Sequence, residues 1–206
     1  MTLAHPPTAA PPAPTPEPAW DIARKFPYQG QWTVDDVLGL PDSRRVELSH
    51  GYVQVLPVPT DYHQAIVGFI YRCLWAFVDA GKLGTVRFFG LKIRVSPEQL
   101  REPDVVFIRT ENTGRRGNQF WSWADLTIEV VSDDYRAHDL ETKRREYAQA
   151  GIPEYWIVDP LLKELTVLAL VGTGYEPACV YRPGDRATSV LLPGFEVEVT
   201  DAFNAD

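Results

Sequence analysis

Alternating and helical patterns of apolar positions divide the chain into short strands and a few helices. Residues 45–56 alternate and break at His50-Gly51, which predicts a β-hairpin with a tight turn. Residues 61–79 carry apolar side chains at helical spacing, and Gly81 follows as a stop signal. The other predicted helices are 33–38 and 139–150, and the other predicted strands are 85–95, 104–108, 126–131, 155–159, 163–171, 175–182 and 188–199.

The order of these elements predicts one α/β domain with a mixed sheet. A strand–helix–strand core flanked by antiparallel hairpins favours a sheet with helices packed on it. The 206 residues suit one domain, which we place at residues 31–206. Residues 1–30 are predicted to be a disordered tail, because the first twenty residues contain seven prolines and little apolar surface.

Composition excludes several classes of protein. A formal net charge of −8 argues against a protein that coats nucleic acid non-specifically, although it leaves room for local basic contacts. The two cysteines have no zinc-ligand spacing, and the apolar runs are far shorter than a membrane span. No secretory signal pattern opens the chain, so we expect a cytoplasmic protein without a membrane partner.

Glu129 is the first charged residue that contradicts its local pattern. It interrupts LTIEVV (126–131), a run that otherwise predicts a buried strand, and alternation places it on the face opposite Leu126, Ile128 and Val130. A buried carboxylate costs several kcal/mol unless it is paired, neutralised or bound to a metal. An edge position or a buried salt bridge explains a single such residue equally well.

Two further charges stand at informative positions. Asp104 follows Pro103 at the start of an apolar strand, where it could face a cleft or simply form a turn. Lys143 lies on the same helical stripe as Leu140 and Tyr147, so it points toward the core or extends along it to reach water. Two carboxylates and one lysine are the groups that metal-assisted phosphodiester hydrolysis needs, with Mg²⁺ or Mn²⁺ held by oxygen ligands.

Several segments resemble, in order and spacing, the Uma-two family of restriction-endonuclease-like proteins. They are VELSHGYVQVL, PTDYHQAIV, REPDVVFI, LTIEVVS, DLETKRREYAQAGIPEYWIVDP and LPGFEVEVTDAF, and together they span roughly residues 32–203. The resemblance implies the PD-(D/E)XK nuclease fold, with Pro103-Asp104 as the PD element and Glu129 as the second acid. The lysine of that motif would fall at Val131, and the resemblance places it instead on the next helix as Lys143.

The resemblance also implies further site residues. Glu47 matches an early glutamate of the family and is expected to be catalytic, unless it pairs with Arg44 or Arg45. The expected metal ligands are Asp104, Glu129 and Val130. His63 and Ser132 are secondary candidates for contact with the phosphate or the site, and His63 at a helix start has a structural alternative.

These observations predict a metal-dependent endonuclease that hydrolyses phosphodiester bonds in DNA. Its DNA contacts are expected from arginines, namely Arg101, Arg109, Arg115, Arg116, Arg144 and Arg145. The alternative is a nuclease-fold module with a weak or inactive site that acts through protein or nucleic-acid binding, and a homodimer suits either hypothesis.

Overall fold

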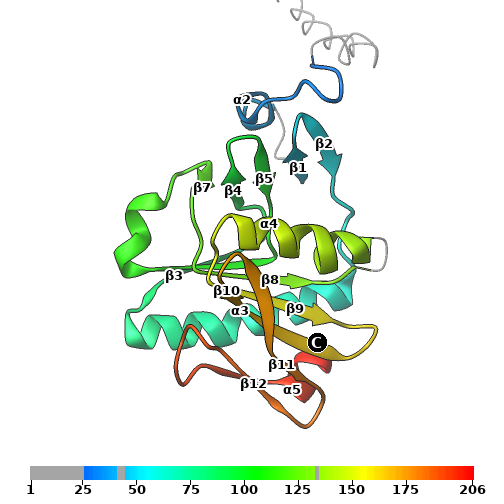
Figure 1. The fold of residues 1–206 in the computed structure, drawn as a ribbon. Coiled ribbons are helices and arrows are strands. Elements are labelled where there is room, and N and C mark those ends of the chain that lie inside the picture. Colours follow the sequence, from blue (N-terminus) through cyan, green and yellow to red (C-terminus); the bar gives the residue numbers. More distant parts are fainter. Residues whose placement is uncertain (1–25, 41–44, 133–134) are drawn as a thin grey trace, which may run out of the picture.

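A mixed six-stranded sheet forms the centre of the molecule (Figure 1). The structure is a computed structural model that describes residues 26–40, 45–132 and 135–206. The strand order is β11-β10-β9-β8-β6-β3, and β8 and β9 are parallel while the other neighbours are antiparallel. The strands are β3 (Gly84–Phe88), β6 (Val105–Arg109), β8 (Leu126–Val130), β9 (Glu154–Asp159), β10 (Glu164–Val171) and β11 (Gly174–Tyr181).

Helices cover both faces of this sheet (Figure 1). Helix α3 (Asp61–Gly81) packs on the face that carries Leu126, Ile128 and Val130. The opposite face is covered by a π-helical turn, η3 (His138–Lys143), and by α4 (Arg144–Gln149), whose Tyr147 belongs to the second core. Strict alternation along β8 therefore separates an apolar face from the face that carries Glu129, as the sequence predicted.

A smaller five-stranded sheet lies against the first and contributes one wall of the site. Its order is β2-β1-β5-β4-β7, with strands β1 (Val46–Ser49), β2 (Tyr52–Val55), β4 (Lys92–Ser96), β5 (Gln99–Arg101) and β7 (Phe120–Trp121). Helix α2 (Val34–Leu38) packs on β1 and starts with the predicted capping box of Thr33 and Asp36. The remaining elements are η1 (Thr110–Arg115), the pair β12 (Arg186–Thr188) and β13 (Glu196–Glu198), and α5 (Val199–Phe203).

The predicted strand 85–95 is wrong, because it is two strands in two different sheets. Phe89 and Gly90 have φ values of 44° and 84°, which end β3 and turn the chain before β4. A left-handed pair cannot continue a ladder, and Gly90 is the residue that tolerates it without strain. This break is what places the second sheet over the first.

Three boundaries also differ from the predictions. Helix α3 is capped by Lys82 in the left-handed conformation, so Gly81 is its last residue rather than its stop. Of the predicted strand 188–199, only Thr188 and residues 196–198 pair, in the two-stranded sheet, before α5 begins. Residues 26–30, assigned to the tail, contact the hairpin: the Gln29 side chain exchanges hydrogen bonds of 2.8 and 3.0 Å with the Val53 backbone. Residues 1–25 of the predicted tail lie outside the described residues.

No helix within the described ranges is long and apolar enough to cross a membrane.

The tight turn between β1 and β2 is held by a glycine that cannot be replaced cheaply. Gly51 has a φ of 82°, and a Cβ there would lie 2.5 Å from the carbonyl of Gly30. We expect Gly51→Ala to lower the free energy of unfolding by about 1–2 kcal/mol for the left-handed backbone and by about a further 1–3 kcal/mol for the overlap. Urea denaturation of the variant and the wild type measures the sum of the two losses.

Gly172→Ala is the matched control for this turn. Its φ of 61° is also left-handed, but nothing lies within 4 Å of the added Cβ. If the two variants lost the same free energy of unfolding, the overlap of the added Cβ with the Gly30 carbonyl would have no effect on stability.

Candidate active site

Glu129 is buried in the middle of the domain and has two strong partners. Its side chain leaves β8 toward α4 and is 2% exposed. The Tyr147 hydroxyl donates a hydrogen bond of 2.6 Å to Oε1, and the Lys143 ammonium lies 3.0 Å from Oε2. The strand face that carries Glu129 and the helix face that carries Lys143 and Tyr147 were both predicted from the sequence. In the structure they meet at the Glu129 carboxylate.

Lys143 is buried among three carboxylates that come from three different elements. Its Nζ lies 3.0 Å from Glu129 Oε2, 3.0 Å from Asp139 Oδ1 and 3.4 Å from Glu47 Oε1. The residue is 4% exposed, so its side chain does not extend to water. A π-helical turn is common at functional sites, and here it presents Asp139 and Lys143 to the same interior point.

The electrostatics of this cluster follow from burial and from mutual charge. Burial disfavours the charged lysine, yet the carboxylates of Asp139, Glu129 and Glu47 outweigh burial and hold the pKa of Lys143 well above its usual value. Burial also raises the pKa of Glu129 well above its ordinary value, against the charge of Lys143 and with the help of the Asp104 carboxylate. Lys143 therefore stays a cation and is the counter-charge of the whole cluster.

Asp104 reaches the same region from the start of β6. Its Oδ2 accepts a 2.8 Å hydrogen bond from the backbone N–H of Val130 and lies 3.3 Å from Nε2 of His63. Its Oδ1 accepts no hydrogen bond from the described residues and is not one of their buried unpaired atoms. One oxygen of this carboxylate therefore anchors the side chain, and the other is accessible to a ligand.

Glu47 lies behind the other site residues and is completely buried. Oε1 accepts a 3.1 Å hydrogen bond from the Glu102 backbone N–H, and Oε2 lies 2.8 Å from Nε2 of His138. Burial would raise its pKa, but the charges of Lys143 and Arg101 and the hydrogen bond from His138 prevail and lower the pKa to about 2. Glu47 is therefore an ionised anchor. Its pairing with Arg45 was one alternative, but Arg45 binds Glu102 instead, and Arg44 lies outside the described residues.

A cavity of about 330 Å³ opens over these groups. Asp104, Glu129 and Lys143 line it, whereas Glu47 does not. The segment from Leu56 to Thr60 and Tyr62 form an apolar part of the wall. The remaining lining residues are Arg45, His63, Glu102, Val130, Val131, Ser132, Tyr135, His138, Asp139 and Pro160.

The donor atoms in this cavity fit a hard divalent cation. Within the described residues, no three acidic, histidine or cysteine side chains form a ready-made metal cage. Two acidic residues, Asp104 and Glu129, line the cavity together with Val130, whose backbone carbonyl is a further oxygen donor. Such a partial set of oxygen ligands suits Mg²⁺ or Mn²⁺, which commonly retain water and substrate phosphate as their other ligands. The Val130 carbonyl also accepts a 3.0 Å hydrogen bond from Nε2 of His63.

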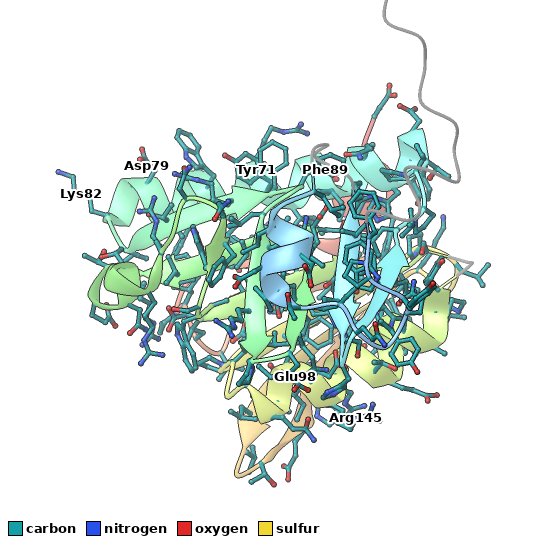
Figure 2. The ribbon with its side chains drawn as sticks, turned by 90° about the horizontal axis from the view of Figure 1, so that it is seen from above. Tyr71, Asp79, Lys82, Phe89, Glu98 and Arg145 are labelled. Atoms are coloured by element: carbon teal, nitrogen blue, oxygen red, sulfur yellow. The ribbon has the colours of Figure 1, made fainter. Side chains whose placement is uncertain are left out.

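The structure separates the predicted DNA-binding arginines from one another. Arg101 is 1% exposed and makes a two-point ion pair with Glu146, at 2.6 and 2.7 Å, so it is a buried structural residue and cannot contact DNA. Arg144 is half-buried and donates to the Tyr175 carbonyl. Arg145 is exposed on α4 (Figure 2).

Arg115 and Arg116 lie at the far end of β8 from the cavity. They stack on Trp123 and Trp121 and follow β6, which runs antiparallel to β8. The length of a five-residue strand, about 15 Å, separates that end of β8 from Val130. Any contact that they make with DNA is distant from the cavity.

Three residues of the cavity were not predicted from the sequence to be site residues. His138 and Asp139 stand at the start of the helix, where polar residues are ordinary, and Arg45 opens the hairpin. Only the convergence of β1, β6, β8 and the π-helical turn gives them a shared cavity. An acidic and a basic residue four positions apart, Asp139 and Lys143, were the one available signal.

Removal of the Lys143 charge should destabilise the domain strongly. We expect Lys143→Met to cost about 3–5 kcal/mol, because it leaves buried carboxylates without their counter-charge. Unpaired buried carboxylates bind protons more tightly in the folded state, so the loss should be larger at pH 8 than at pH 5. Urea denaturation at the two pH values measures it.

Lys82→Met is the control for this substitution, since Lys82 is exposed at the end of α3 (Figure 2). Its expected change is within about 0.5 kcal/mol. A Lys143→Met loss that is independent of pH would contradict the role of Lys143 as counter-charge.

The chain is similar in sequence and structure to nuclease-related proteins. The model of the Uma2 family, described as "Putative restriction endonuclease", matches residues 34–200. The structure is similar, with a TM-score of 0.70, to a crystal structure from Anabaena variabilis described as a putative nuclease belonging to DUF820. The two share 19% identity over 84% of this chain and 98% of that one. No curated protein sequence matches the chain.

The family match and the structural likeness confirm the predicted α/β fold of the restriction-endonuclease-like class. The family match covers the hairpin, both sheets and the π-helical turn, and therefore every element that lines the cavity. The chain belongs to the Uma2 family.

Proposed function

We propose that this protein is an endonuclease that hydrolyses phosphodiester bonds in DNA with the help of Mg²⁺ or Mn²⁺. Its family and its structural relative from Anabaena variabilis are both described as nucleases. The chemistry of the cavity supports the same activity independently of those descriptions. Asp104, Glu129 and Lys143 then correspond to the PD-(D/E)XK residues, with the lysine on the helix after the second acid.

One observation carries the proposal: the buried ammonium of Lys143 lies 3.0 Å from Glu129 in a cavity that Asp104 also lines. Stability alone does not account for a lysine among three carboxylates, since apolar residues of similar volume are often as stable as buried ion pairs. A cavity that combines accessible carboxylate oxygens with a fixed positive charge suits an anionic substrate that arrives with a cation.

Each residue has a definite task in this proposal. Asp104 and Glu129, with the Val130 carbonyl, would hold the cation beside the scissile phosphate. When bound, the cation supplies polarisation of the phosphoryl group and a lower pKa for the attacking water. Lys143 would stabilise negative charge that develops on the phosphoryl oxygens, because its ammonium is fixed in the cavity wall by its carboxylate partners.

The apolar and basic parts of the cavity wall suit a nucleotide. Arg45 lines the cavity, stacks 4.5 Å from the Phe89 ring centroid and is held by Glu102 at 3.0 Å. A guanidinium in this position would bind a phosphate next to the scissile one, and the Leu56–Thr60 segment would contact sugar and base. Local contacts of this kind are compatible with a net charge of −8.

The non-catalytic alternative has one observation in its favour. The three N–H groups of Lys143 face three carboxylates, so a phosphate must displace one of these partners to bind the ammonium. A module of this kind would bind DNA without cutting it, and a cleavage assay distinguishes the two hypotheses.

The cleavage assay uses the purified full chain with supercoiled plasmid and with single-stranded DNA, in the presence of Mg²⁺ or Mn²⁺. We expect nicking that is absent in EDTA. Asp104→Asn should lower the cleavage rate by about 10²–10³-fold, because it removes a charged ligand of the cation that stabilises the transition state. Asp79→Asn, at an exposed site near the other end of α3, should keep the wild-type rate (Figure 2).

Wild-type protein that binds DNA but leaves it intact with both metals would support the non-catalytic module instead. Full activity in Asp104→Asn would place the cleavage elsewhere or in a contaminant.

Arg45 should contribute to DNA affinity more than the arginines at the far end of the sheet. We expect Arg45→Gln to weaken DNA binding and to reduce the slope of log K against log salt by about 1, as for one lost phosphate contact. Fluorescence anisotropy at several salt concentrations measures this slope. Arg116→Gln is the comparison, and a larger effect there would restore the DNA contact first predicted for Arg116.

A further inference from the structure

The partly buried His138 and the buried Glu47 form a pair at the edge of the cavity, and the proposed function gives neither a role in proton transfer. His138 begins the π-helical turn and lines the cavity, while Glu47 leaves β1 behind it. Nε2 of the ring lies 2.8 Å from Glu47 Oε2. Since Glu47 is ionised and can only accept, the proton of this hydrogen bond belongs to Nε2.

This hydrogen bond determines what the other ring nitrogen can do. In the neutral ring, a proton on Nε2 leaves Nδ1 with a lone pair. No described residue donates a hydrogen bond to Nδ1, and it is not among the buried unpaired atoms, which are His63 Nδ1, Trp123 Nε1 and Thr127 Oγ1. Nδ1 of His138 is therefore an accessible proton acceptor on a ring that lines the cavity.

The two other nitrogen groups that line the metal-binding side of the cavity cannot accept a proton. The pKa of Lys143 is raised well above its usual value by its three carboxylates, so it stays charged. His63 directs Nε2 at the Val130 carbonyl and at Asp104, and its Nδ1 is sealed from solvent. Neither is a candidate base.

The remaining carboxylates of the wall are already paired with cations. Asp139 holds the Lys143 ammonium at 3.0 Å. Glu102 is held by Arg45 and by Lys92, each at 3.0 Å. Both carboxylates are thus occupied by cationic partners, which leaves His138 as the acceptor with the fewest competing contacts.

We infer that His138 is the general base of the proposed phosphodiester hydrolysis and that Glu47 positions it. The inference rests on the proposed function. Nδ1 takes a proton from the attacking water, whose oxygen forms a bond to phosphorus. The bond from phosphorus to the leaving oxygen breaks, and that oxygen keeps the electron pair and is protonated by solvent.

Glu47 then has two tasks that explain its complete burial. It holds the imidazole in the tautomer with Nε2–H, as the carboxylate does in hydrolases with a histidine base. It also contributes one of the three carboxylates around Lys143 at 3.4 Å. One anion behind the cavity thus orients both the base and the fixed cation.

The first experiment removes the ring and restores it from solution. His138→Ala in the full chain should lower the rate of plasmid cleavage by about 10²–10⁴-fold, the usual contribution of a general base. Added imidazole should restore a large part of the loss in a concentration-dependent way. Circular dichroism and urea denaturation check that the variant is folded, and His138→Gln is used if it is not.

His50→Ala is the matched control. His50 also pairs with a glutamate, Glu98, at 3.2 Å, but both side chains are more than half exposed on the surface. This variant should cleave at the wild-type rate with and without imidazole.

The second experiment does not depend on cleavage. Nitrogen-15 NMR of the histidine rings should show the Nε2–H tautomer for His138 in the wild type. In Glu47→Gln, the amide can donate to Nε2 and should shift the ring toward the Nδ1–H tautomer, which has no lone pair at Nδ1.

The outcomes separate the inference from the function on which it rests. A wild type that cleaves, with a His138→Ala variant that keeps its rate or gains nothing from imidazole, overturns the role of His138 and leaves the nuclease. An Nδ1–H tautomer in the wild type overturns it as well. A wild type that never cleaves DNA removes the nuclease function and this role together.

Discussion

The burial of one ammonium among three carboxylates is the constraint on which the rest of the structure depends. Lys143 and Glu129 are both almost inaccessible to water, and Lys143 keeps its charge there because Glu129, Asp139 and Glu47 surround it. Their elements must therefore arrive together, because a lone charge at this depth would cost several kcal/mol. The pairing joins the π-helical turn to β8 and fixes which face of the helix meets the sheet.

The second sheet contributes a carboxylate to the charged cluster around Lys143. Glu47 comes from β1 in the five-stranded sheet, whereas Glu129 comes from the six-stranded sheet, and Lys143 bridges them. Arg101 of β5 is bonded to Glu146 of α4 and lies 3.7 Å from Glu47, so a buried ionic network crosses the same boundary. The buried polar groups thus contribute to the contact between the two sheets. An apolar core contributes as well, in which Ile93 and Trp121 of the second sheet pack with Val106 and Ile108 of the first.

Local patterns predicted most elements because their causes are local. The capping box at Thr33, the hairpin at His50-Gly51 and helix α3 follow from residues within a few positions of one another. The strand predicted at 85–95 was wrong because alternation alone does not show that Phe89 and Gly90 are left-handed. Arg101 was assigned to DNA because its charge was visible in the sequence, whereas its burial against Glu146 depends on a partner 45 residues away.

The sequence by itself determined that Glu129 would lie on a buried strand, that Lys143 would face inward and that Asp104 would begin a strand. These conclusions depend on periodicity, which each segment carries in its own side chains. Only the tertiary structure decided that Glu47 lies behind the cavity, that Asp139 joins the cluster and that His138 lines the cavity with one ring nitrogen bonded to Glu47. These facts depend on how two sheets and a π-helical turn meet, and distances between such elements are not encoded in any local pattern.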